Sequence, residues 1–200
     1  NLFFRGNAPV VVYLSLFQGS QQLLKQSMRK TGVFTTPVEL DSRAKLFDSV
    51  LLFSASAGTY QNRTNEAASS ATADLYHTGS GCLVEESGDQ IFVGMDAPFR
   101  YIHFLLSSTG VGGTVAYAYW NGSQWMEFTP SGGISHLDSA TERILLWDDY
   151  IGLPGDWQKC QVNSDNRFWI KVEVTSSYSS GPVGSQTSAI SELNALVARR

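Results

Sequence analysis

The tryptophans are the side chains of this sequence whose types and spacing best fit ligand chemistry. Trp120 and Trp125 flank an Asn121-Gly122 pair, and Gln124 lies between them. Asn-Gly favours a tight reversal because both residues tolerate positive φ, so we expect the two indoles at the end of a hairpin. Exposed indoles there could stack on sugar rings, with Asn121 and Gln124 nearby as polar contacts. Buried indoles would instead anchor the core through their large area.

Both interpretations of Trp120 and Trp125 stay open at this point. For the later tryptophans we favour the core interpretation, because an indole buries a large area: Trp147, Trp157 and Trp169.

The acidic residues do not form a catalytic motif. Glu85-Glu86 and Asp148-Asp149 are adjacent pairs, and neighbours on a strand point to opposite faces, so neither pair converges as a dyad. A glycosidase would have to draw on Asp148, Asp149, Asp156 and Glu127, and the sequence gives no reason to choose among them. The three aspartates could bind calcium, but loop carboxylates without an ion are the favoured interpretation. We therefore expect no catalytic residue, no metal site and no cofactor.

Cys82 and Cys160 are the two cysteines of the chain. They could pair in a secreted protein, but the sequence shows no signal-peptide pattern, so two thiols are the favoured interpretation. The histidines have no metal-ligand spacing with them. His103 lies in a strongly apolar run, where we expect a core histidine with a hydrogen-bond partner.

The composition is typical of an all-β protein. The chain has 200 residues, of which 42% are hydrophobic, 12% aromatic and only 16% charged, against about 25% charged residues in soluble domains generally. The net charge is −4 and the basic residues are scattered, so we expect no direct nucleic-acid partner. No apolar run approaches the roughly 20 residues that span a bilayer, so we expect no membrane partner.

Short alternating runs separated by turn signals dominate the chain from about Asp74. Seven or eight such strands in about 100 residues predict an antiparallel, jelly-roll-like β-sandwich over residues 74–176. The runs are Asp74–His77, Gln90–Gly94, Phe99–Ser107, Thr114–Trp120, Gln124–Phe128, Glu142–Trp147 and Arg167–Thr175.

The segments on either side of the sandwich differ from it. Residues 1–73 predict an extended N-terminal arm with a strand at Val10–Leu14, a short marginal helix at Gln21–Lys30 and a second apolar run at Ser49–Phe53. For residues 177–200 we expect a linker followed by a short amphipathic helix. The linker is the run Ser176–Ser188, which is rich in Ser and Gly, and the helix covers Ala189–Arg200. The apolar groups at both ends need a partner, so we expect assembly contacts at Leu2, Phe3, Phe4, Ile190, Leu193, Leu196 and Val197.

An ordered series of motifs resembles a β-sandwich module of tail, baseplate and capsid-associated proteins of tailed bacteriophages. The series is Tyr119–Trp125 (YWNGSQW), Ile144–Trp147, Pro154–Trp157 (PGDW) and Phe168–Val172 (FWIKV), preceded by Gln90–Gly94 and Pro98–Ile102. Phe92 and Phe168 stand where the module usually has tyrosine. The resemblance covers residues 74–176 and neither end of the chain.

The resemblance implies a non-enzymatic structural protein located in the virion, such as a capsid decoration, minor capsid or tail-associated protein. We expect it to bind other virion proteins of the capsid or tail through its arms and to form homo-oligomers. The alternative is a carbohydrate-binding module for host or surface attachment, with a glycan held at Trp120, Asn121, Gln124 and Trp125.

Overall fold

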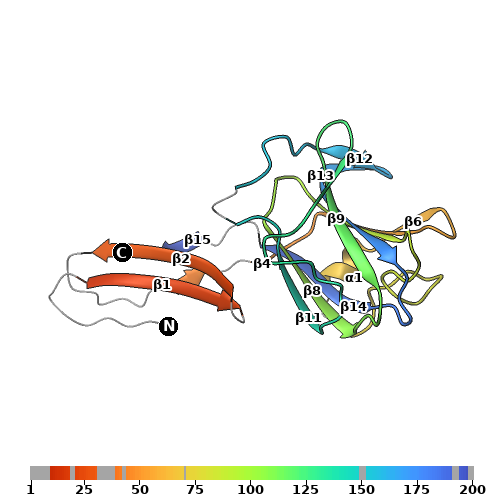
Figure 1. Cartoon of the computed structure of the whole chain (residues 1–200), viewed down its shortest axis with the longest axis horizontal. Helices are drawn as coiled ribbons and strands as arrows, with labels where there is room; N and C mark the ends of the chain where they lie inside the picture. Colours follow the sequence, from red (N-terminus) through yellow and green to blue (C-terminus); the bar gives the residue numbers. More distant parts are fainter. Residues whose placement is uncertain are drawn as a thin grey trace. The chain divides into compact units, whose positions relative to one another are not determined.

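The computed structural model describes residues 10–18, 21–30, 39–41, 44–69, 71–148, 152–190 and 194–197. The chain divides into two compact units, here called the terminal unit (Asn1–Arg43 with Glu192–Arg200) and the sandwich unit (Ala44–Ser191). Nearly all described residues with regular structure are in antiparallel strands, so the expected all-β class is confirmed (Figure 1).

The sandwich unit contains two antiparallel sheets. The larger has the strand order β10-β9-β13-β7-β5-β6, and β12 also pairs with β13. Its strands are β5 (Ser49–Ser54), β6 (Thr59–Asn62), β7 (Gln90–Met95), β9 (Thr114–Trp120), β10 (Trp125–Phe128), β12 (Cys160–Val162) and β13 (Asp165–Ser176). The smaller has the order β11-β8-β14-β4, with β4 (Ala44–Leu46), β8 (Tyr101–Ser108), β11 (Thr141–Leu145) and β14 (Val183–Ile190). One short helix, α1 (Thr64–Ala68), follows β6.

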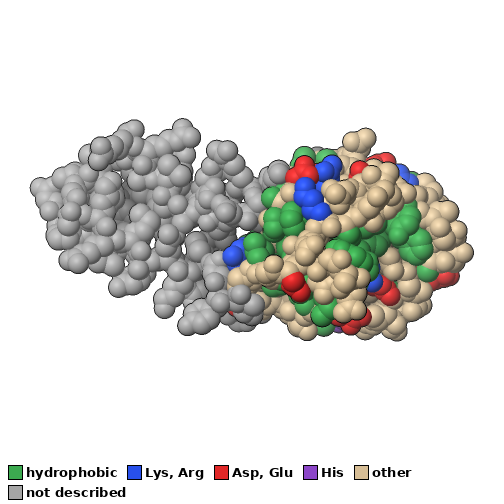
Figure 2. Space-filling model, turned by 90° about the horizontal axis from the view of Figure 1, so that it is seen from above, with side chains coloured by type: hydrophobic (Ala, Val, Ile, Leu, Met, Phe, Trp, Pro, Cys, Tyr) green, Lys and Arg blue, Asp and Glu red, His purple; other side chains and the backbone are tan. Residues whose placement is uncertain are grey.

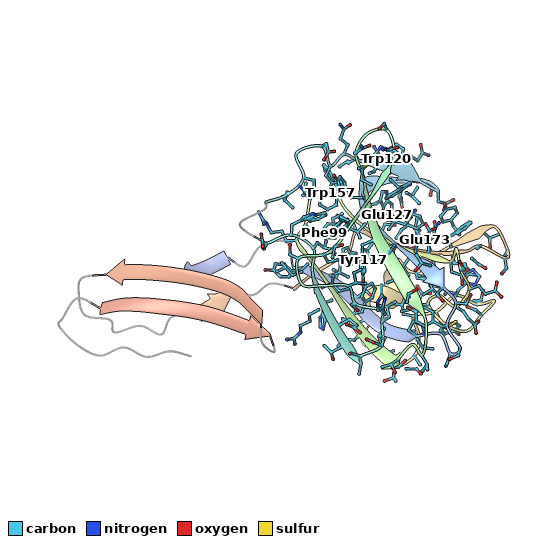
Figure 3. All side chains as sticks on the ribbon, in the orientation of Figure 1. Phe99, Tyr117, Trp120, Glu127, Trp157 and Glu173 are labelled. Carbon is cyan, nitrogen blue, oxygen red and sulfur yellow. The ribbon has the colours of Figure 1, made fainter. Side chains whose placement is uncertain are left out.

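A hydrophobic core shared by both sheets holds the sandwich unit together. Alternate residues of β8 are buried, as the period of two of a strand requires. They pack in one cluster with the inward-facing residues of β5, β7, β9 and β13. An aromatic group closes one part of this core: Trp157 lies 5.3 Å from Phe99 and 4.7 Å from Trp147 between ring centroids. Figure 3 labels Phe99, Tyr117 and Trp157 of this core.

The terminal unit consists of two two-stranded sheets in its described part. β1 (Val10–Gln18) pairs with β2 (Gln21–Lys30), and β3 (Glu39–Asp41) pairs with β15 (Asn194–Val197). The helix predicted at Gln21–Lys30 is wrong, because ten residues of helix formers make at best a marginal helix and the ladder with β1 gives their backbone groups partners. The predicted C-terminal helix is wrong too, since Ala189 and Ile190 end β14 and the next described residues form β15.

Two further segments take a different structure from the one predicted. Ser49–Phe53, expected in the arm, is strand β5, and its residues Val50, Leu51 and Leu52 are buried. The expected linker ends in β14, which lies between β8 and β4. Gly184 lets β14 approach Leu75 closely, because a Cβ there would lie 2.9 Å from the Leu75 side chain. The segment around Leu75, predicted as a strand, forms only an isolated bridge with Gly184.

Several predicted assembly contacts lie outside the described residues. Leu2, Phe3, Phe4 and Leu193 are among them, and the backbone alone is described at Ile190, Leu196 and Val197. Those contacts stay predictions. Among the described residues, no helix is long and apolar enough to span a bilayer.

Candidate functional site

The predicted hairpin is confirmed, with Trp120 and Trp125 as the cross-strand pair at its end. Four residues connect them, and Asn121 organises the turn: its Oδ1 accepts hydrogen bonds from the backbone N–H of Ser123 and of Gln124, both at 2.9 Å. Gly122 has φ +97°, which a side chain would strain. The side-chain oxygen of Asn121 is therefore occupied by the turn. Gln124 is exposed, and its amide nitrogen contacts Met126.

The two indoles join a line of rings on the outer face of the larger sheet, the face opposite the shared core. Ring centroids are 5.7 Å apart for Trp120 and Trp125, 5.6 Å for Trp125 and Phe92, and 5.9 Å for Phe92 and Tyr60. Phe53 follows at 4.8 Å from Tyr60. We call these five rings the outer aromatic row: Phe53, Tyr60, Phe92, Trp120 and Trp125.

Small residues in the strands beneath make this row possible. Ala118 of β9 lies between Glu127 of β10 and Lys171 of β13 in the register, and only 2% of its surface is exposed. With so small a side chain there, the Trp125 ring can extend across the sheet from β10 towards Phe92 on β7. Gly94 likewise leaves room for the Trp169 ring, because a Cβ at Gly94 would overlap the six-membered ring of that indole.

Four of the tryptophans divide into two kinds by their N–H groups. Trp157 and Trp169 are buried and donate to backbone carbonyl oxygens, at 3.2 Å to Trp169 and at 3.0 Å to Cys160. Trp157 and Trp147 lie in the shared core, as predicted, whereas Trp169 is buried in a separate hydrophobic cluster of the larger sheet. Trp120 and Trp125 are half-buried. Among the described residues neither indole N–H has a hydrogen-bond acceptor, and neither nitrogen is fully buried. Their N–H groups therefore reach solvent.

Trp125 and Trp120 differ in how firmly they are packed. Trp125 contacts a second small hydrophobic cluster on the outer face, made of Leu51, Phe92, Val162 and Trp169. Trp120 is not part of that cluster, and its ring contact is with Trp125. Trp125 is thus partly a structural residue, whereas Trp120 lies outside this cluster. Figure 2 shows hydrophobic side chains that reach the surface of the sandwich unit between polar and charged ones.

Charged and polar side chains lie beside the row. Lys171 Nζ donates to Glu173 Oε2 at 2.6 Å, and the same oxygen accepts from Gln90 Nε2 at 3.1 Å. Lys171 Nζ also lies 5.5 Å from the centroid of the Trp125 ring, within the range of a cation–π contact. No described residue donates to Glu173 Oε1, and Glu127 has no ion pair in the described part of the chain. Figure 3 labels Trp120, Glu127 and Glu173 of this face.

The acidic residues considered for chemistry have different contacts in the described part of the chain. Asp156 accepts a hydrogen bond from the Tyr119 hydroxyl at 3.1 Å, and desolvation with this carboxylate raises the pKa of Tyr119. The backbone carbonyl oxygen of Asp148 accepts a hydrogen bond from the Arg100 guanidinium, and the backbone N–H of Asp148 donates one to the Ser131 hydroxyl. Asp149 lies outside the described residues. The described residues contain no group of three side chains that could hold a metal ion.

The two cysteines are thiols as expected, whereas His103 departs from its expectation. Both thiols are free, and burial raises the pKa of Cys82 and brings that of Cys160 to about 11. His103 is only half-buried, with a buried Nε2 that has no hydrogen-bond partner. The expected core histidine with a partner for that atom is therefore wrong, because Arg143 stands opposite it in the register and is itself a donor.

The sequence did not single out Phe53, Tyr60 or the Gln90–Lys171–Glu173 group as site residues. The only local signal was the alternation in Arg167–Thr175, which sets Lys171 and Glu173 on the side opposite the core residues. Comparison of the chain with protein-family models, curated proteins and solved structures gives no match.

Proposed function

We propose that the chain is a non-enzymatic structural protein of a tailed-phage virion that binds other virion proteins and copies of itself. The resemblance of the Tyr119–Trp125 hairpin and its companion motifs to a phage module supports this. A jelly-roll-like connectivity of the sandwich is part of what we propose. In the structure the motif residues serve the framework: Trp157 and Trp169 are buried, and Asn121 shapes its turn.

The observation that carries the proposal is the open-edged construction of the terminal unit. β1 has nine residues and β2 has ten, yet within the described residues each pairs only with the other. A two-stranded sheet is marginally stable alone, and long unpaired edges are avoided in proteins that stay monomeric. Strand addition from another chain would satisfy these backbone groups.

Self-association through these edges is tested by the mass of the full chain in solution. We expect light scattering to give a multiple of 21.9 kDa. Val12→Pro removes one N–H from β1 and should shift the mass towards 21.9 kDa, since proline cannot donate to a ladder. Val12→Thr keeps the donor and a β-branched side chain, so it should behave as the wild type. A monomeric wild type would refute self-association.

The tryptophans provide a folding control for the sandwich unit in this experiment. All five tryptophans lie between residues 120 and 169, inside the sandwich unit. Near-ultraviolet circular dichroism of Val12→Pro should therefore match the wild type. The location is tested separately by peptide mass spectrometry of gradient-purified particles from cells that carry the coding sequence, where absence of the chain would contradict a virion role.

A further inference from the structure

We infer that the outer aromatic row and the Lys171–Glu173 pair beside it form a binding site for a neutral glycan. This goes beyond the structural role proposed above and does not depend on how the terminal unit assembles. It rests on three properties of the face: partly exposed rings, hydrogen-bonding groups that have no partner among the described residues, and the sign of the local charge.

The rings offer a surface for the flat C–H face of a sugar. An aromatic face carries negative charge density from its π electrons and attracts polarised C–H groups that lie over it. Tyr60 is 39% exposed, and Phe53, Trp120 and Trp125 are half-buried, so each has ring surface left for a ligand. Phe92 is the buried ring of the row, it contacts both Trp125 and Tyr60, and the buried Trp169 packs against it.

The polar groups of the face match a polyol, whose hydroxyls both donate and accept. The N–H groups of Trp120 and Trp125 are donors that reach solvent, and Glu173 Oε1 is an acceptor without a described partner. Glu173 is held in place by Lys171 and Gln90 through its other oxygen. A ligand would therefore meet a carboxylate that is already oriented, which lowers the entropy cost of binding.

The charges select among ligand classes. A protein partner fits this face poorly, because charged residues are depleted from the centres of protein interfaces and here a charged pair adjoins the rings. Nucleic acids and anionic glycans are disfavoured since Glu127 and Glu173 outnumber Lys171, and the net charge of the chain is −4. The occupant that fits both the rings and the charges is an uncharged oligosaccharide.

The first experiment presents the full-length protein to an array of neutral and anionic glycans. We expect binding to at least one neutral glycan, followed by titration of that glycan with tryptophan fluorescence as the readout. Its affinity should change less than twofold between 50 and 500 mM NaCl, on the order expected when few charges are neutralised on binding. Binding to no neutral glycan, or to anionic glycans alone, would overturn the inference.

The second experiment asks whether this face holds the glycan. Trp120→Ala removes the ring that lies outside the outer cluster and should weaken binding at least tenfold, whereas Trp120→Phe should restore part of the loss by stacking. Glu173→Gln keeps the size of the side chain and should also weaken binding. Val111→Ala, at a residue 54% exposed in the loop before β9 and at the opposite end of that strand from Trp120, is the control and should bind as the wild type.

Folding is checked for each variant by thermal melting and near-ultraviolet circular dichroism. If Trp120→Ala changes the fold, Glu173→Gln decides the matter, because its carboxylate lies at the surface, 34% exposed. Wild-type affinity in a folded Trp120→Ala protein, or in Glu173→Gln when the first variant is misfolded, would place the glycan elsewhere and refute the assignment.

Discussion

Gly94 is the position where a single methyl group tests the packing of the outer face. It lies on β7 opposite Trp169 of β13, and a Cβ there would overlap the indole. Trp169 cannot simply move away: it is fully buried, its N–H donates to the Cys160 carbonyl at 3.0 Å, and Phe92 lies edge-on at 6.2 Å. Gly94→Ala should therefore strain the cluster rather than be absorbed by it.

The expected cost is a net loss of about 2 kcal/mol in the free energy of unfolding. Overpacking of a core costs about 1 to 3 kcal/mol, and a weakened Trp169 hydrogen bond adds about 1 kcal/mol. The alanine regains about 0.5 to 1 kcal/mol because it restricts the unfolded chain. For a unit of this size the melting temperature should fall by about 4 to 8 °C. Urea denaturation followed by tryptophan fluorescence measures the same change.

Gly155→Ala is the matched control. A Cβ at Gly155 would meet nothing within 4 Å, and its φ is not in the positive region, so this variant should be neutral or more stable by up to about 1 kcal/mol. In the Gly94→Ala background, Trp169→Phe should cost at least about 0.5 kcal/mol less than in the wild type, since residues in contact couple. A Gly94→Ala protein that melts within about 1 °C of wild type would refute the reasoning.

Three further expectations follow from buried polar groups. Asp89→Ala should cost about 2 to 4 kcal/mol in urea denaturation, because this buried carboxylate accepts hydrogen bonds from three backbone N–H groups, including that of Glu85 at 2.9 Å; a change below about 0.5 kcal/mol would contradict it. Burial, and then the charge of Arg143, lowers the pKa of His103, so the unfolded chain binds the proton more readily and stability should fall as the pH drops below 6.5. His103→Gln should show a shallower loss between pH 7 and pH 5 in thermal melts, and an unchanged slope would exclude His103 as the cause. Burial raises the pKa of Cys160 to about 11, so at pH 8 its thiol should react with a thiol reagent much more slowly in the native protein than in urea; equal rates would contradict that burial.

Features that depend on neighbouring residues could be predicted from the sequence. The hairpin at Thr114–Phe128 was predictable because a turn signal separates two alternating runs. Arg167–Thr175 lies within β13, and the burial of Ile170, Val172 and Val174 on one face follows the period of two. In both cases the evidence lies within a single stretch of chain.

Features that depend on pairing partners far along the chain could not be predicted in this way. Gln21–Lys30 has good helix formers and becomes a strand by pairing with β1, and Val183–Ile190 has the composition of a linker and becomes a strand beside β8. Strand pairing supplies backbone hydrogen bonds that intrinsic propensity does not describe.

In the candidate site, too, some residues could be predicted from local sequence and others depend on distant strand pairing. Trp120 and Trp125 stood out because they flank a recognisable turn. Phe53 and Tyr60 reach them only through the order β13-β7-β5-β6, which brings together segments that are far apart in the sequence. Asn121 organises the turn through its side-chain oxygen, which is a local interaction, and its role as a ligand contact stays a prediction.

The place of β14 between β8 and β4 sets an order of events during synthesis. β4 is among the first strands of the sandwich unit to leave the ribosome, yet its partner β14 ends at Ile190. Until then β8 has a neighbour only on the β11 side, and the smaller sheet is incomplete. Completion of the sandwich therefore waits until β14 has been synthesised and requires a large loop to close, and nascent chains that stop near Ser176 would present an unpaired β8 edge to chaperones and proteases.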